Sequence, residues 1–369
     1  MNFLRQVLSV LVTALAVLVF NIVPAQAKKP GSPGGGGPGQ NGGGLIYFRY
    51  DRDIYTMNDD GSDMTVVAGY PDGYVVSSEP VPSRQLYGGK RWFPLWSGQE
   101  LLGLSDAGGV VSLHNDPQLE RTASVGWQVR DEAISWTGRR RDNTGAVVEG
   151  GIYSTPVTFD GAGNIASAGT TELLVSLPLV DDIGGSLTPD IIWHDWSPDG
   201  TQFVYDTHSY ETVIADLSSG TIDTVIADTW DPRWSPAGDK LMVKYPGRRS
   251  HVVGVMNLDG SHRKSIASDG ISWEYDPGVW SPTGSHLTFL REDYTFTDSY
   301  IARSTADGKG KRRLTDSSVA SGIYQLKPLG WREAPATAPP VPEPQAASIV
   351  VIGLSTLLGV WRRRGTSKC

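Results

Sequence analysis

The sequence of 369 residues has few of the residues and motifs that serve as nucleophiles, metal ligands or cofactor sites. Its single cysteine is Cys369, the last residue, so disulfides, cysteine nucleophiles and cysteine-based metal sites are excluded from the rest of the chain. The six histidines form no His-x-His or His-Glu-x-x-His pair. A serine-hydrolase elbow, a P-loop and a dinucleotide-binding glycine motif are absent as well. We therefore expect no catalytic residue, no metal and no cofactor.

Positive charge is scarce in the central part of the chain. Residues 45–333 contain 25 Lys and Arg against 39 Asp and Glu, a formal charge of −14. This balance argues against a groove for nucleic acid or for an anionic membrane surface. We expect no nucleic-acid partner.

Long apolar runs occur only near the two ends. Val7–Val23 is almost wholly apolar, follows Arg5 and precedes the small-x-small sequence Ala25-Gln26-Ala27. This pattern predicts a signal peptide over residues 1–27. An uncleaved membrane anchor is the alternative, and either reading exports the rest of the protein. The Gly- and Pro-rich residues 28–44 predict a flexible linker.

The C-terminal end has the opposite order. A second, proline-rich linker covers residues 334–345 and is followed by an apolar run, Ala346–Trp361, and by three arginines. The run has 16 residues, fewer than the roughly 20 that a membrane-spanning helix needs. The arginines predict that the end of the chain stays on the cytoplasmic side.

Together these features resemble a PEP-CTERM sorting signal, in the order motif, apolar segment and basic cluster: Pro342, Glu343, Pro344, then residues 346–361, then Arg362, Arg363 and Arg364. The resemblance covers about the last 25 residues and implies transient membrane insertion and cleavage by an exosortase near the Pro-Glu-Pro motif. It also implies a final location at the cell surface or in the extracellular matrix. The five residues after the arginines depart from the pattern. An ordinary C-terminal membrane anchor, in residues 346–369, is the alternative.

An internal repeat predicts the fold of the central part. Three segments share one pattern: Trp196-Ser-Pro-Asp-Gly200, Trp234-Ser-Pro-Ala-Gly238 and Trp280-Ser-Pro-Thr-Gly284. Each is followed by two short β-rich runs, a tight turn and a last short strand, and the repeat recurs at roughly 40 residues, as in propeller blades. Weaker copies at Trp96-Ser97-Gly98 and Trp136-Thr137-Gly138 lack the proline but keep the tryptophan, and a turn is predicted at each.

The two ends of this region complete one further blade. Leu45–Tyr50, Asp53–Met57 and Met64–Ala68 read as strands two to four, and Tyr324–Trp331 reads as the missing first strand. We predict an all-β, six-bladed propeller of four-stranded antiparallel blades over residues 45–333, closed by N- and C-terminal strands that share a blade. The Gly-rich residues 160–171 are assigned to a long loop.

The repeat resembles the TolB-type, or WD-like, propeller repeat. Ile54-Tyr-Thr-Met-Asn-Asp-Asp-Gly61 matches its second half, and Trp196–Gly200 matches its first. The resemblance spans residues 45–333 and implies the fold, but little about function, because such propellers serve as binding modules, lyases and peptidase domains. In the similar oligogalacturonate lyases, channel histidines bind a divalent metal, and His194 is the best-placed candidate for such a role.

Aromatic and acidic residues recur just before the blade tryptophans, on strands expected to line the channel. We predict a ligand site at one channel mouth formed by Trp193, His194, Asp195, Trp230, Asp231 and Asp276. Rings that stack and carboxylates that accept hydrogen bonds suit a carbohydrate or a peptide. The alternative, which we favour for most of the tryptophans, is packing between blades.

The sequence predicts an exported, non-enzymatic binding or scaffold propeller with an exosortase-type partner and an unidentified protein or glycan ligand. One alternative is a metal-assisted polysaccharide lyase, which three or more histidines or carboxylates converging in the channel would favour. The other is a TolB-like periplasmic adaptor, for which we would expect a separate α/β domain before the blades.

Overall fold

The computed structural model describes the propeller region. It covers residues 44–70, 81–97, 99–181, 185–217, 219, 221–248, 250–268, 273–293, 299–315 and 326–332. The elements in these ranges are β-strands, β1 to β26. A helix with the length and apolar character to cross a membrane is not found among them. The predicted signal peptide and the sorting tail lie outside the described residues.

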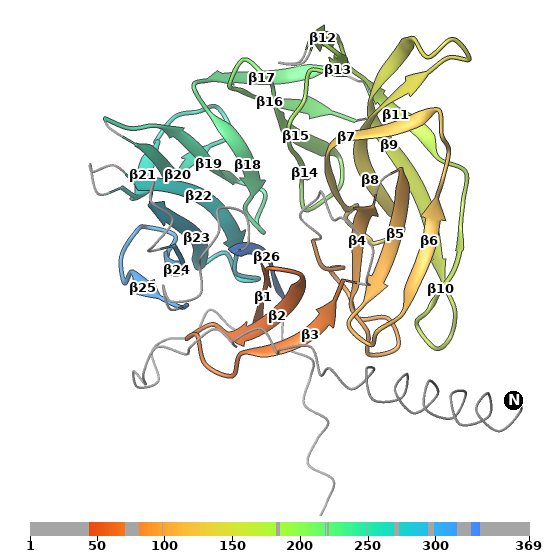
Figure 1. The fold of residues 1–369 in the computed structure, drawn as a ribbon. Coiled ribbons are helices and arrows are strands. Elements are labelled where there is room, and N and C mark those ends of the chain that lie inside the picture. Colours follow the sequence, from red (N-terminus) through yellow and green to blue (C-terminus); the bar gives the residue numbers. More distant parts are fainter. Residues whose placement is uncertain are drawn as a thin grey trace, which may run out of the picture. The chain divides into compact units, whose positions relative to one another are not determined.

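The strands form six successive sheets that follow chain order around a central axis (Figure 1). The first sheet contains β26 (Leu326–Arg332), β1 (Leu45–Tyr50), β2 (Asp53–Asn58) and β3 (Thr65–Gly69). The second contains β4 (Trp92–Ser97), β5 (Glu100–Ser105) and β6 (Val110–His114). The third contains β7 (Leu119–Trp127), β8 (Ala133–Arg141), β9 (Val147–Phe159), β10 (Ile165–Ala168) and β11 (Glu172–Ser176).

A two-stranded sheet of β12 (Leu179–Asp181) and β13 (Leu187–Pro189) leads into the second half of the ring. The fourth sheet contains β14 (His194–Trp196), β15 (Gln202–Asp206), β16 (Glu211–Asp216) and β17 (Ile222–Ala227). The fifth contains β18 (Trp230–Trp234), β19 (Lys240–Pro246), β20 (His251–Asn257) and β21 (Lys264–Ala267). The sixth contains β22 (Trp273–Trp280), β23 (His286–Asp293), β24 (Tyr300–Thr305) and β25 (Arg312–Arg313).

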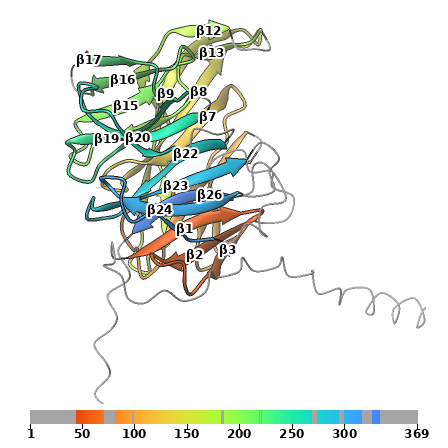
Figure 2. The same ribbon diagram turned by 90° about the vertical axis from the view of Figure 1, so that its left-hand side faces the viewer.

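The predicted closure of the ring is confirmed. Strand β26 pairs antiparallel with β1, with Leu45 opposite Arg332 and Tyr50 opposite Leu326, and the two strands lie side by side in Figure 2. The chain therefore joins its last described strand to its first, and the first blade holds both. The prediction of four strands in every blade is correct for the first, fourth, fifth and sixth sheets, whereas the second sheet has three described strands and the third has five.

Apolar packing lies between the blades. Six buried clusters each join two neighbouring sheets, so every interface of the ring has its own core. Most tryptophans are buried in these interfaces, which confirms packing as their main role: Trp92, Trp96, Trp127, Trp136, Trp196, Trp234, Trp280 and Trp331. Burying such side chains is the main favourable term that closes a ring without disulfides.

The repeated Trp-Ser-Pro-x-Gly motif ends each innermost strand of blades 4 to 6 and turns the chain into the next strand. In each turn the glycine amide donates a hydrogen bond to the carbonyl of the motif's serine. Gly200, Gly238 and Gly284 have φ values of 76°, 73° and 69°, a left-handed conformation that glycine adopts without the cost of a Cβ atom.

The third blade makes the same turn with different residues. Trp127 ends β7, and the amide of Asp131 donates to the carbonyl of Gln128 at 3.0 Å with a φ of 56°. Aspartate is one of the few residues that tolerate this conformation, so the turn needs no glycine. The predicted turn at Trp136-Thr137-Gly138 is wrong, because these residues lie within β8.

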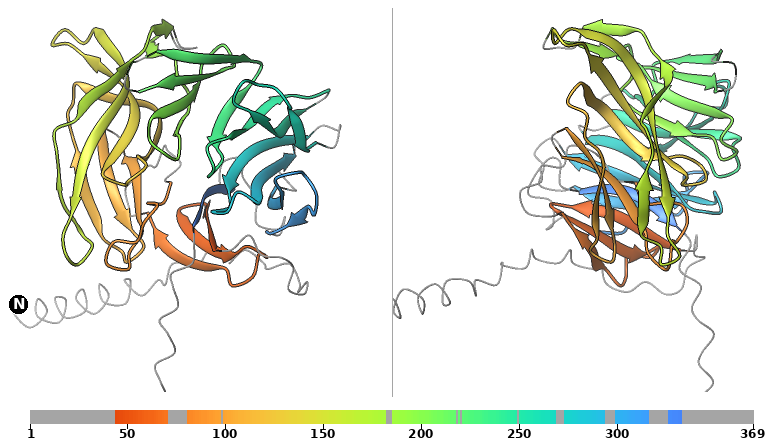
Figure 3. Two further views of the ribbon diagram at one scale, coloured as in Figure 1. Left: turned by 180° about the vertical axis from the view of Figure 1, so that it is seen from behind. Right: turned by 90° about the vertical axis from the view of Figure 1, so that its right-hand side faces the viewer.

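The predicted long loop at residues 160–171 is also wrong. Strand β10 pairs antiparallel with the 13-residue strand β9 to form a hairpin, which runs along the outer side of the second blade beside β6 (Figure 3). Phe159 stacks on Tyr87 with ring centroids 3.6 Å apart, and the Trp92 indole donates to the carbonyl of Gly163. The insertion thus covers the second blade, which has three described strands.

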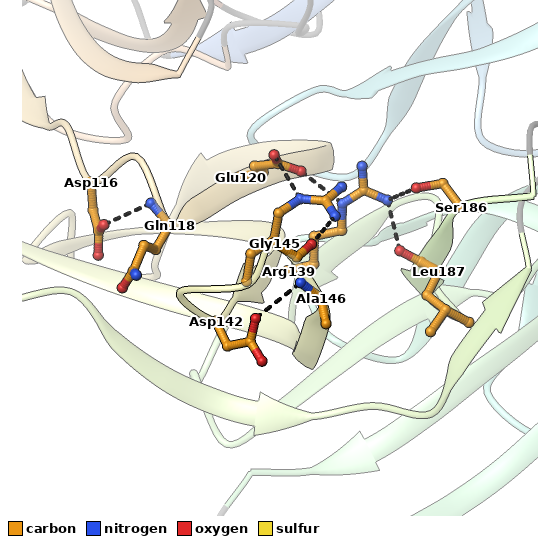
Figure 4. Close-up of polar contacts among 10 residues, drawn as sticks. Asp116, Gln118, Glu120, Arg139, Asp142, Gly145, Ala146, Ser186 and Leu187 are labelled. Carbon is orange, nitrogen blue, oxygen red and sulfur yellow. Dashed lines mark hydrogen bonds and ion pairs between the residues drawn. The ribbon is translucent and has the colours of Figure 1, made fainter.

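The run of three arginines on β8 is neutralised locally. Glu120 on β7 accepts from Arg139 and from Arg141, each at 2.9 Å, and Arg139 also donates to the Ser186 hydroxyl and the Leu187 carbonyl (Figure 4). These contacts tie the β12–β13 hairpin to the third blade. They give the arginine run a structural role rather than that of an open anion site.

Candidate functional site

A cavity of about 80 Å³ lies among the innermost strands. Trp193 directly precedes β14, and Asp231 and Lys327 are the second residues of β18 and β26, so these three lining residues lie towards the starts of their strands, away from the ends that carry the blade tryptophans. Residues from blades 4, 5, 6 and 1 line it: Trp193, Asp231, Arg233, Asp276, Pro277, Leu290, Lys327 and Pro328. Three predicted site residues, Trp193, Asp231 and Asp276, are thus brought together. We call this space the mouth cavity.

Two lining residues, Asp276 and Lys327, form an ion triad with Lys244 that joins three blades. Asp276 on β22 contacts the ammonium of Lys244 on β19 at 2.5 Å and that of Lys327 on β26 at 3.1 Å. The Asp276 and Lys244 side chains are only 15% and 7% exposed. Burial alone would raise the pKa of Asp276, but the two ammonium groups outweigh it and lower this pKa to about 2. The carboxylate is therefore ionised and saturated with positive partners.

Two further lining residues, Trp193 and Asp231, are positioned by a buried carboxylate. One Asp206 oxygen accepts from the Trp193 amide at 2.6 Å, and the other accepts from the Asp231 amide at 2.9 Å, which fixes blades 4 and 5 relative to each other. Burial and the nearby charge of Asp231 raise the pKa of Asp206. The Arg233 guanidinium lies 3.7 Å from the centre of the Trp193 ring, a distance typical of a cation–π contact.

His194 does not line the mouth cavity. Its ring is buried between blades 3 and 4, where Nδ1 contacts the Ser124 hydroxyl at 2.6 Å and Nε2 contacts the Ser135 hydroxyl at 2.8 Å. Burial, with a contribution from Arg233, lowers the pKa of His194 to about 3, so the ring is neutral. Since both nitrogens are engaged by hydroxyl groups, the residue joins two blades and is not placed to hold a metal.

Asp195 and Trp230 also lie outside the lining of the mouth cavity. Asp195 accepts from the amides of Trp196 and Trp234, both at 2.9 Å, and so links blades 4 and 5. Trp230 is part-exposed and packs against Tyr210 and His251. Within the described ranges, no group of three His, Cys, Asp or Glu side chains converges as metal ligands would. The convergence that would favour the lyase alternative is therefore not observed there.

The segment that precedes β4 is held by residues of three blades. Arg332 donates to the Pro82 carbonyl at 3.0 Å, and Arg91 donates to the carbonyls of Ser83 and Arg84 at 2.9 and 3.0 Å. The amide of Gln85 then donates to Asp131 in the third blade. This segment therefore links blades 1, 2 and 3 at the turn end of their innermost strands.

Three cations of the site were not predicted from the sequence. Lys244 and Arg233 come from blade 5 and Lys327 from blade 1, and each meets its acidic or aromatic partner across a blade interface. The available signal was their position, because Arg233 and Lys327 lie on innermost strands as the predicted acidic residues do. The lining therefore adds positive charge to the aromatic and acidic residues that the sequence predicted.

Solved structures of other proteins resemble this chain in fold. No protein-family model and no curated protein matches the sequence. TolB from Acinetobacter baumannii has a TM-score of 0.51 at 12% identity, over 80% of this chain and 68% of that chain. A chain of a nidogen–laminin complex has a TM-score of 0.50 at 10% identity, over 80% of this chain and all of that chain. At these identities the likeness shows the fold alone, and this chain is a six-bladed β-propeller that resembles TolB and other propellers in structure.

Proposed function

We propose that this protein is an exported, non-enzymatic binding or scaffold propeller that holds a glycan at its mouth cavity. The observation that carries the proposal is the meeting of an aromatic ring from blade 4 with four charged side chains from blades 5, 6 and 1: Trp193, Asp231, Arg233, Asp276 and Lys327. Rings and hydrogen-bonding charges in one concave site suit the apolar faces and hydroxyl groups of a sugar.

The state of the carboxyl groups supports binding rather than catalysis. A general acid or base needs a pKa near the working pH and a path to the substrate. Asp276 has a pKa of about 2 and two ammonium partners. Asp206, whose pKa is raised, is buried with both oxygens accepting from backbone amides. Both groups therefore position the site.

Binding is tested with the mature protein and immobilised extracellular polysaccharides. Replacing Trp193 with Ala removes the ring beneath Arg233 and should weaken binding about 10- to 100-fold, the equivalent of about 1.4–3 kcal/mol. The control is Ile222→Ala, since Ile222 is 59% exposed on the outer strand β17 and far from the mouth in the blade. Wild-type protein that binds no polysaccharide, or equal binding by the Trp193 variant, would contradict the proposal.

Delivery to the cell surface rests on the sequence of the two ends. The signal peptide over residues 1–27 exports the propeller, and the sequence from Pro342 to Arg364 resembles an exosortase signal. Mass spectrometry of mature surface protein should recover peptides of the propeller but none from residues 361–364. Replacing Glu343 with Ala should retain those peptides in a membrane fraction. Their presence in the mature wild-type protein would instead indicate an ordinary membrane anchor.

A further inference from the structure

Beside the mouth cavity lies a group of three aromatic rings, which we call the aromatic platform: Tyr210, Trp230 and His251. The Trp230 ring lies between the other two, 5.2 Å from Tyr210 and 4.9 Å from His251, and it meets His251 edge-on at 88°. The three residues come from the β15–β16 turn, from the start of β18 and from the start of β20. The platform therefore bridges blades 4 and 5 on the mouth side of the ring.

The conformation of Tyr210 keeps its ring at the surface. The side chain is 57% exposed although it is large and aromatic, and its φ of 60° lies in the left-handed region, where bulky residues are uncommon. The Tyr210 amide donates to the Thr207 carbonyl, and its own carbonyl accepts from the Thr229 amide, both at 3.0 Å. Glycine or asparagine would suit this turn better, and strained backbone of this kind is concentrated at functional sites.

The platform is continuous with the mouth cavity through the backbone. Trp230 directly precedes Asp231, which lines the cavity. Asp206 accepts from the Asp231 amide and from the Trp193 amide, and it ends strand β15, just before the turn that carries Tyr210. The same carboxylate therefore fixes the cavity wall and the edge of the platform.

We infer that the aromatic platform is a second sugar subsite, on which Tyr210 stacks against a pyranose ring of a glycan whose neighbouring residue occupies the mouth cavity. This inference rests on the proposed function, and it adds that the site reads a chain of linked sugars. Exposed aromatic rings bind the apolar face of a pyranose, while hydroxyl groups at the ring edge remain hydrated. A short sugar reaches only the mouth cavity, whereas a longer one contacts both subsites.

The test compares sugar lengths in the full mature protein by titration calorimetry. The probes are β-1,4-linked glucose oligosaccharides and uronate-containing oligosaccharides, each as a disaccharide and a hexasaccharide. Tyr210→Gly suits the backbone φ and is expected to fold normally. It should weaken hexasaccharide binding about 10-fold and leave disaccharide binding unchanged, whereas Tyr210→Phe should retain both affinities because it keeps the ring.

The outcomes separate the inference from the proposed function. Trp193→Ala should weaken disaccharide and hexasaccharide equally, because it acts in the mouth cavity. If Trp193→Ala weakens binding and Tyr210→Gly changes neither affinity, the platform is not a subsite and the proposed function stands. Equal losses for both sugar lengths in Tyr210→Gly would also overturn the inference. Absence of binding by the wild-type protein to every probe would overturn both.

Discussion

A chain lacking residues 324–331 is expected to lose cooperative folding, whereas a chain that ends at Glu333 should keep wild-type stability. Strand β26 contributes Leu326 and Trp331 to the core between blades 6 and 1, and Leu329 to the core between blades 1 and 2. Removing it opens both interfaces and leaves the backbone of β1 without its neighbour. The combined loss should exceed the roughly 5–15 kcal/mol that stabilises a typical domain.

Urea denaturation followed by tryptophan fluorescence measures this effect, and one point variant makes it graded. The Trp331 side chain is only 1% exposed. Trp331→Ala should therefore lower the free energy of unfolding by about 3–5 kcal/mol while leaving β26 in place. The truncation after Glu333 is the matched control, since it removes only residues beyond the last described strand. Equal unfolding midpoints for the two truncations would show that β26 does not close the ring.

The repeat predicted the ring well because its signals are local. A proline and a glycine at fixed spacing determine a turn, and a tryptophan at the end of each innermost strand fills a blade interface. The turn of the third blade was not predicted, because Asp131 adopts the left-handed conformation there in place of glycine. Trp136-Thr137-Gly138 resembles the turn motif in sequence, but these residues lie within strand β8 and form no turn.

The candidate site was predicted only in part, because its partners meet across blades. Sequence placed Trp193, Asp231 and Asp276 near one mouth, and the structure brings them to one cavity. It could not show that Lys244 and Lys327 neutralise Asp276, since those contacts depend on the register of strands far apart in the chain. His194 was misplaced for the same reason, because the hydroxyl groups that surround it belong to the preceding blade.

Replacing Asp276 with Asn should destabilise the ring strongly. The change leaves the ammonium groups of Lys244 and Lys327 without the carboxylate between them, and Lys244 is only 7% exposed. Removing one member of a buried ion cluster costs about 3–5 kcal/mol, and we expect about 3 kcal/mol here because Lys327 is 20% exposed. Urea denaturation at pH 7 measures the loss, and Asp307→Asn, at an exposed turn, is the control.

The pH dependence of stability distinguishes this electrostatic effect from a general packing defect. Because the folded protein lowers the pKa of Asp276 from its ordinary 3.8 to about 2, the stabilisation is fully present above pH 3.8. It is lost as the pH falls from 3.8 towards 2. The stability of the wild-type protein should therefore approach that of Asp276→Asn over this interval. At pH 7, adding Lys244→Met to the Asp276→Asn variant should restore part of the lost stability, because it removes a buried charge. A difference between the wild type and Asp276→Asn that stays constant from pH 7 to pH 2 would show that the two lysines do not stabilise the carboxylate, and that the side chain acts by packing alone.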